Sequence, residues 1–162
     1  MSDYEVVKTY YDRARASTLR QLRALSPEMI EWQPKRGSPS IGWFFTNSVV
    51  FEDIEITGRF TRNWVLPMEI VAAFKTEKNV LRSRHTLPSK PELEHFLQHL
   101  KKQTDRFLKA LIDDAMESQF YKRKYGEKLL TDTLRKVVFH EITNFGQIQA
   151  FLSLHTSEYK RK

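Results

Sequence analysis

Apolar residues recur every three or four positions along most of the chain, which is the period of an amphipathic α-helix. This spacing predicts long helices over residues 4–25, about 40–60, about 90–114 and 134–155, and a short helix at 68–75. Ser26 precedes a single turn, Ser38 or Ser40 precedes the second long helix, and Thr131 or Thr133 precedes the last, as helix caps do. Strand patterns are absent from the sequence.

The connections between the long helices differ in length. Residues 61–88 carry little pattern and contain two proline breaks, and a second weakly patterned stretch covers 113–128. A long crossover is typical of bundles in which consecutive helices are not adjacent. We therefore expect an all-α fold, a four-helix bundle with a long crossover between its second and third helices, in a single domain over residues 1–162.

Polar side chains interrupt the apolar faces of the second and fourth long helices. Asn47 lies in the middle of one apolar arc, while His140 and Asn144 lie four residues apart on the shoulder of another. Glu141 is near the centre of that same face. Because a buried polar group needs a partner, we expect these side chains to meet others across the bundle. For Glu141 the position favours an ion pair with an arginine over a role as a pocket acid or base.

The composition removes several chemistries. The chain has no cysteine, so it offers no disulfide, thiolate ligand or thiol nucleophile of its own. It has no run of about 18 apolar residues and no secretion-signal pattern at its start, so we expect neither a membrane span nor export by that route. Glycine-rich phosphate loops and nucleophile elbows are also missing. These features are typical of a reduced, cytoplasmic protein.

The chain is basic, with a formal net charge of +7. Its cations, Arg15 among them, are scattered and mixed with acidic residues, apart from a basic tail at about 156–162 that ends in Lys160-Arg161-Lys162. Such a distribution is typical of solvated surface, and no nucleic-acid-binding motif accompanies it. Nucleic acid is therefore not an expected partner.

Two stretches of the chain form a recognisable combination. They are Ser40-Ile41-Gly42-Trp43-Phe44-Phe45-Thr46-Asn47 with Glu52, and His140-Glu141-Ile142-Thr143-Asn144-Phe145-Gly146-Gln147-Ile148. Together they resemble the DinB-like (DinB/YfiT) family of metalloenzymes. The segment Leu25-Ser26-Pro27-Glu28, followed by Trp32-Gln33-Pro34, is also similar to that family, so the resemblance covers essentially the whole chain.

The resemblance implies a four-helix bundle, often dimeric, that holds nickel or zinc on three histidines, one from the second helix and two from the fourth. It implies activities such as S-transfer from an external low-molecular-weight thiol, and some isomerase or hydrolase activities. The family name refers to DNA damage, which concerns gene induction under stress and gives no physical reason for DNA contact. A homodimer and a small-molecule or thiol ligand are the partners expected on this basis.

The chain departs from the family pattern at two of the three metal positions. Asn47 and Asn144 stand where the family has histidines, and His140 alone remains. An amide carbonyl is a hard, neutral oxygen donor that cannot match imidazole for nickel or zinc. We therefore expect the two asparagines to hydrogen-bond to each other and to His140, without a cofactor.

The alternative is an altered divalent-metal site for nickel or zinc, with His140 as its principal ligand. Glu52, Glu141 and Gln147 would then support the pocket. Glu52 is expected towards the side of its helix that water or a partner can reach.

Other histidines carry weaker signals. His95 and His99 are one turn apart, which is metal-ligand spacing, but they lie opposite the apolar stripe of their helix. Without a third ligand we expect a solvated pair. His155 lies one turn past Phe151, where it could cap the open end of the bundle.

Three functional hypotheses follow. The first is a ligand-binding or non-catalytic DinB-like protein whose former metal pocket is lined by Asn47, His140 and Asn144. The second is a metal-dependent thiol S-transferase or hydrolase with an atypical site in the same place. The third is a stress-related interaction protein that uses its basic surface and its tail.

Overall fold

The computed structural model describes residues 3–75, 87–113 and 126–159, and in these ranges the only regular structure is helical. The expected all-α fold is therefore confirmed. The helices, in chain order, are α1 Asp3–Ala24, α2 Pro27–Glu31, α3 Ile41–Glu52, the π-helix η1 Asp53–Thr61, α4 Met68–Lys75, α6 Lys90–Asp113 and α8 Gly126–Tyr159.

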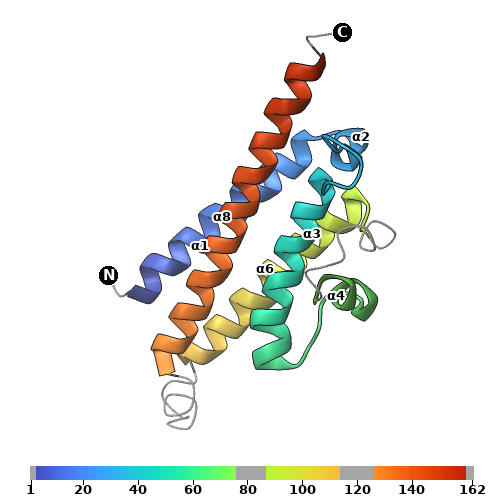
Figure 1. The fold of residues 1–162 in the computed structure, drawn as a ribbon. Helices are drawn as coiled ribbons and strands as arrows, with labels where there is room; N and C mark the ends of the chain where they lie inside the picture. Colours follow the sequence, from blue (N-terminus) through green and yellow to red (C-terminus); the bar gives the residue numbers. More distant parts are fainter. Residues whose placement is uncertain (1–2, 76–86, 114–125, 160–162) are drawn as a thin grey trace.

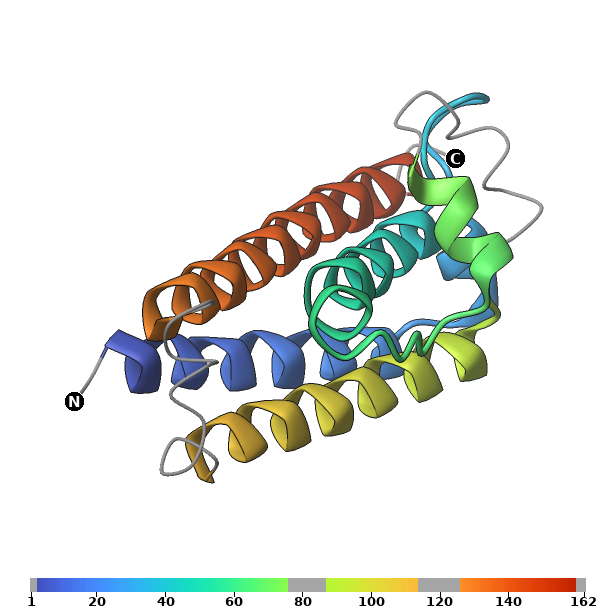
Figure 2. The ribbon, with the colours of Figure 1, turned by 90° about the horizontal axis from the view of Figure 1, so that it is seen from below.

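The four long helices pack side by side in the cyclic order α1, α8, α3, α6. Figures 1 and 2 show that α1 and α8 run in one direction, while α3 and α6 run in the opposite one. Because α3 and α6 are parallel neighbours, the chain between them must return to the end at which α3 began. The long crossover with α4 makes this return, and the prediction that consecutive helices are not adjacent is wrong for this pair.

Serine caps begin two helices where the sequence predicts them. The Ser26 hydroxyl accepts a hydrogen bond from the Met29 N–H at 3.3 Å, and Pro27 occupies the first helical position of α2. The Ser40 hydroxyl accepts from the Trp43 N–H at 3.2 Å and starts α3. Local side-chain chemistry therefore determines where these helices start.

The second long helix changes character at Asp53, which the apolar pattern does not predict. The Thr57 and Thr61 hydroxyls donate to the carbonyls of Asp53 and Thr57, four residues earlier, at 3.0 and 2.6 Å. The buried Asp53 carboxylate accepts from the Val65 and Leu66 N–H groups that follow η1. These bonds hold the turn into the crossover, and the Asp53 side chain is buried.

The last helix starts earlier than predicted. It begins at Gly126, and Thr131 and Thr133 are buried inside it instead of capping it. Leu130 already packs against the apolar core, so burial extends the helix towards its amino-terminal end. Part of the weakly patterned stretch, 114–125, lies outside the described residues. Of the expected tail, 156–159 belongs to α8 and 160–162 is not described.

The core consists of two apolar clusters separated along the helix axes. One contains Leu22, Phe45, Leu97 and Ile148, with eleven further buried residues. The other contains these buried residues: Val7, Tyr11, Ile56, Leu108, Leu134, Val137 and Val138. Buried residues of α1, α6 and α8 belong to both clusters, and Arg15, Glu52 and Glu141 lie between the two clusters along the chain.

None of the described helices is both long enough and apolar enough to cross a membrane.

Gly42 allows α3 to pack closely on α2. A Cβ atom at this position would lie 2.8 Å from Ile30 Cγ2 and 3.2 Å from the Ile30 carbonyl oxygen. Gly42→Ala should therefore lower the free energy of unfolding by about 1–3 kcal/mol, measured by urea denaturation. Gly146→Ala is the matched control, because nothing lies within 4 Å of its Cβ position, and alanine there should stabilise the helix by up to about 1 kcal/mol. An unchanged stability of Gly42→Ala would contradict the packing argument.

Candidate functional site

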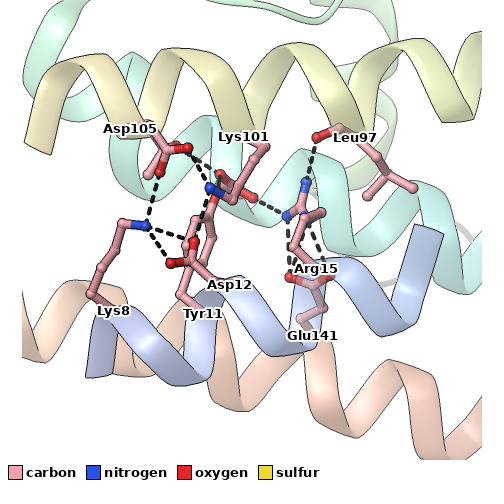
Figure 3. Close-up of polar contacts among 10 residues, drawn as sticks. Lys8, Tyr11, Asp12, Arg15, Leu97, Lys101, Asp105 and Glu141 are labelled. Atoms are coloured by element: carbon pink, nitrogen blue, oxygen red, sulfur yellow. Dashed lines mark hydrogen bonds and ion pairs between the residues drawn. The ribbon is translucent and has the colours of Figure 1, made fainter. Parts of the chain in front are cut away.

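Arg15 is a buried cation between the two apolar clusters, with 1% of its surface exposed. Its Nε and Nη2 atoms lie 3.1 Å from the two carboxylate oxygens of Glu141, as Figure 3 shows. Nη2 also contacts Glu52, and Nη1 donates to the Leu97 carbonyl oxygen at 3.0 Å. One guanidinium therefore joins α1 to α3, α6 and α8.

Glu52 has two neutral hydrogen-bond donors in addition to Arg15. The Tyr11 hydroxyl and the Thr104 hydroxyl donate to its Oε1 at 2.6 and 2.7 Å, and all three side chains are buried. Burial raises the pKa of Tyr11 well above its usual value, and the adjacent Glu52 charge raises it further. The phenol therefore stays protonated and donates a hydrogen bond to Glu52, which stabilises the charge of that carboxylate. This additional donor matters because Arg15 divides its positive charge between Glu52 and Glu141.

Electrostatic attraction in this cluster exceeds the cost of burying the arginine. Burial lowers the pKa of Arg15, but Glu141 and Glu52 raise it more, so the net shift is upwards. With one cation and two carboxylates, the cluster of Arg15, Glu52 and Glu141 carries a formal charge of −1. The ion pair expected for Glu141 is confirmed with Arg15 as its partner.

A second, half-exposed charge group continues this arrangement between α1 and α6. Lys8 lies 2.6 Å from Asp12 and 3.0 Å from Asp105, while Lys101 lies 2.8 Å from Asp12 and also contacts Asp105. Figure 3 shows the four side chains next to Tyr11. Single exposed ion pairs contribute little, but the closed arrangement of four charges holds α1 against α6.

Two residues of the buried cluster are placed where sequence reasoning does not put them. Glu52 has no exposed surface, so the expectation that water or a partner reaches it is wrong. Arg15 is buried rather than part of the solvated basic surface. A signal for Arg15 does exist, because Tyr11, Arg15, Thr18 and Leu22 follow one another at intervals of four, three and four on one helix face.

The three residues at which the resemblance places metal ligands lie on facing helices, Asn47 on α3 and His140 and Asn144 on α8. Asn47 Nδ2 donates to Asn144 Oδ1 at 3.4 Å, and Asn144 Nδ2 donates to the Ser48 hydroxyl at 2.8 Å. Asn144 is 5% exposed, whereas Asn47 is half-buried rather than enclosed as its place in the apolar arc suggests. The two amides thus bond to each other, as expected.

His140 is held by stacking and by the backbone of α3. Its ring lies 4.0 Å from the Phe51 ring, centroid to centroid, and almost parallel to it. Burial lowers the pKa of His140, and a hydrogen bond to the Asn47 backbone opposes this only in part. Its Nε2 atom is buried and has no hydrogen-bond partner among the described residues. The expected bond from the asparagine amides to this ring therefore does not form.

These residues do not fit a transition-metal ion. Among the described residues, no three histidine, cysteine, aspartate or glutamate side chains come together in a way that could hold a metal. Glu52 and Glu141 are both engaged by Arg15, and Gln147 is exposed. One imidazole nitrogen with amide oxygens is a weak set of donors for nickel or zinc.

The other histidines of the described ranges lie elsewhere. The rings of His95 and His99 stack with centroids 5.7 Å apart on the outer side of α6, and Gln103 hydrogen-bonds to His99. His155 packs edge-on against Trp32 at 5.1 Å near the end of the bundle. His155 does not complete a three-ligand metal site with His95 and His99.

One comparison with known proteins identifies a family. The sequence profile of the family described as the DinB superfamily matches residues 10–148, most of the chain and all the residues of the buried cluster. Comparisons with curated proteins and with solved structures give no match.

Removing the guanidinium should leave two carboxylates buried without a counter-ion. Arg15→Met should therefore lower the free energy of unfolding by about 3–5 kcal/mol in urea denaturation at pH 7. The exposed Arg20 lies on the same helix, and Arg20→Met should change stability by less than about 0.5 kcal/mol. Adding Glu52→Gln and Glu141→Gln to Arg15→Met should recover part of the loss. A cost below about 1 kcal/mol for Arg15→Met would show that the cluster is not the constraint described.

Acid should destabilise the fold in part through His140. Because its pKa is lower in the folded state than in the unfolded chain, the unfolded state binds the proton more readily. The stabilisation from keeping this ring neutral is present above the unfolded value of about 6.5 and is lost as the pH falls through the folded value. Urea denaturation from pH 7.5 to pH 5 should show a smaller loss for His140→Gln than for the natural chain. Parallel losses would mean that His140 titrates equally in both states.

Proposed function

The chain belongs to the DinB superfamily, and we propose that it is a ligand-binding member without a transition-metal centre. The observation that carries this proposal is the hydrogen bonding of Asn144, which stands at one of the family's histidine positions. Both ends of its buried amide are engaged by the protein, Oδ1 by Asn47 and Nδ2 by Ser48. Hydrogen bonds between neutral groups therefore occupy the place of two ligands.

Binding a metal through the Asn144 side chain would require one of these bonds to break. The Asn144 carbonyl oxygen would have to leave Asn47 Nδ2, which would then lack this acceptor. Leaving a buried polar group unpaired costs about 1–3 kcal/mol, and the carbonyl oxygen gained is a poor ligand for nickel or zinc. The amide network is the more stable arrangement.

The polar chemistry left for a ligand is at His140. The neutral ring uses the Asn47 backbone for one nitrogen, which leaves the lone pair of Nε2 free to accept a hydrogen bond. Phe51 stacks on the ring and forms an apolar wall next to it. A small molecule with a hydroxyl or N–H donor and an apolar part has the matching chemistry.

The same free nitrogen supports a second candidate, a metal-dependent thiol S-transferase or hydrolase with an atypical site. An unpartnered imidazole nitrogen is also a metal ligand, and His140 would be its principal donor. The other donors near His140 are amide oxygens, which are weak ligands for nickel or zinc. Metal content separates it from the first.

The test is metal content, measured by mass spectrometry on protein purified without an affinity tag or chelator. The double variant Asn47→His/Asn144→His restores the three histidines of the family pattern and should carry about one nickel or zinc per chain. The natural chain should carry well below one equivalent. Asn63→His, at an exposed asparagine of the crossover, is the matched control and should also carry little metal.

Stoichiometric nickel or zinc in the natural chain would overturn the proposal in favour of the second candidate. If the restored variant stays metal-free while its circular dichroism is unchanged, the pocket does not have the geometry proposed here.

A further inference from the structure

A cavity between α1 and α8 is separate from Asn47, His140 and Asn144. Its volume is about 250 Å³, and five residues of α1 and three of α8 line it. These residues are Tyr10, Arg13, Ala14, Ser17, Thr18, Glu141, Ile142 and Phe145. The two helices run in parallel along this side of the molecule, as Figures 1 and 2 show. One water molecule needs about 30 Å³, so the cavity is too large for a single bridging water.

Thr18, in the wall of this cavity, has a buried hydroxyl without a partner. Thr18 is 3% exposed, and its Oγ1 makes no hydrogen bond to any described residue. One turn further along α1, both amide atoms of the buried Gln21 also lack partners. A buried polar group left unpaired costs about 1–3 kcal/mol, so such groups usually have a partner that does not come from the chain itself.

The charges around the cavity are separated. Glu141 borders it from the buried cluster, whose formal charge is −1, since Arg15 faces both Glu141 and Glu52. Arg13 borders it from the exposed side, and no described residue forms an ion pair with this guanidinium. The inner side is therefore negative and the outer side positive.

The remaining walls are apolar. Tyr10 and Ile142 are 54% and 52% exposed, and Phe145 is half-buried beside them. Tyr10 lines the cavity from α1, and Ile142 and Phe145 line it from α8. A ligand that covers this surface would remove exposed apolar area from water, which favours binding.

We propose that this cavity binds a small zwitterion of the α-amino-acid class with an apolar side chain. The ammonium group lies inward, where it donates to Thr18 Oγ1 and faces the Glu141 charge. The carboxylate lies outward and pairs with Arg13. The side chain packs against Tyr10, Ile142 and Phe145. A simple carboxylate lacks the inner donor, and a simple amine lacks the partner for Arg13, so neither matches both ends.

The test compares three probes of one shape: L-phenylalanine, 3-phenylpropanoate without the ammonium, and 2-phenylethylamine without the carboxylate. Binding is measured by calorimetry and by chemical-shift changes of α1 and α8 amides in the full chain. L-phenylalanine should bind saturably at one site, and each of the other two at least about tenfold more weakly, which corresponds to about 1.4 kcal/mol.

Variants assign the two polar contacts. Thr18→Val removes an unpartnered hydroxyl at nearly constant shape, so the fold should survive, and it should weaken L-phenylalanine binding about tenfold, as should Arg13→Gln. Arg20→Gln, at an exposed arginine outside the cavity, should leave binding unchanged.

Three results would overturn the proposal. One is 3-phenylpropanoate binding as tightly as L-phenylalanine, and another is undiminished binding by Thr18→Val. The third is the absence of saturable binding for phenylalanine, leucine and methionine alike, for example because a second copy of the chain covers Tyr10 and Ile142, which sedimentation would show. None of these results depends on the metal content of the protein. The amino-acid proposal can therefore fail while the function proposed above stands, and the reverse.

Discussion

The fold depends on one buried cation that must satisfy two carboxylates. Arg15 from α1 meets Glu52 from α3 and Glu141 from α8, and it also binds a backbone carbonyl of α6. Breaking such a group leaves an uncompensated charge in the core, so a shift of any helix by one turn is strongly disfavoured. The register fixed in this way also positions the amide site, because Glu141 directly follows His140 and Glu52 lies five residues after Asn47.

Sequence reasoning succeeds where the cause is local. Helix periodicity and the caps Ser26 and Ser40 depend on near neighbours, and the observed helices follow them. It fails where a distant partner determines the structure. Glu52 is buried because Arg15, 37 positions away in the sequence, neutralises it. The π-helix η1 forms around Asp53, whose carboxylate accepts hydrogen bonds from Val65 and Leu66. The meeting of Asn47 and Asn144 was predictable only because the resemblance placed both at one site.

The described structure contains both fully paired buried charges and buried polar atoms without partners. Between the apolar clusters, the charges of Arg15 and Glu52 are matched by buried partners. Among the described residues, His140 Nε2, Thr18 Oγ1 and both amide atoms of Gln21 are buried and lack hydrogen-bond partners. A rigid charged layer allows unsatisfied groups to persist beside it, since the surrounding helices cannot easily rearrange to satisfy them.

The order of the buried charges along the chain has a consequence for synthesis on the ribosome. Arg15 and Glu52 emerge first and can balance each other one to one, whereas Glu141 emerges only with the last helix. Docking of α8 then adds a second carboxylate to a site that is already neutral. The apolar burial of Leu134, Val138 and Ile148 must offset that added charge, so the core closes only when nearly the whole of α8 has been made.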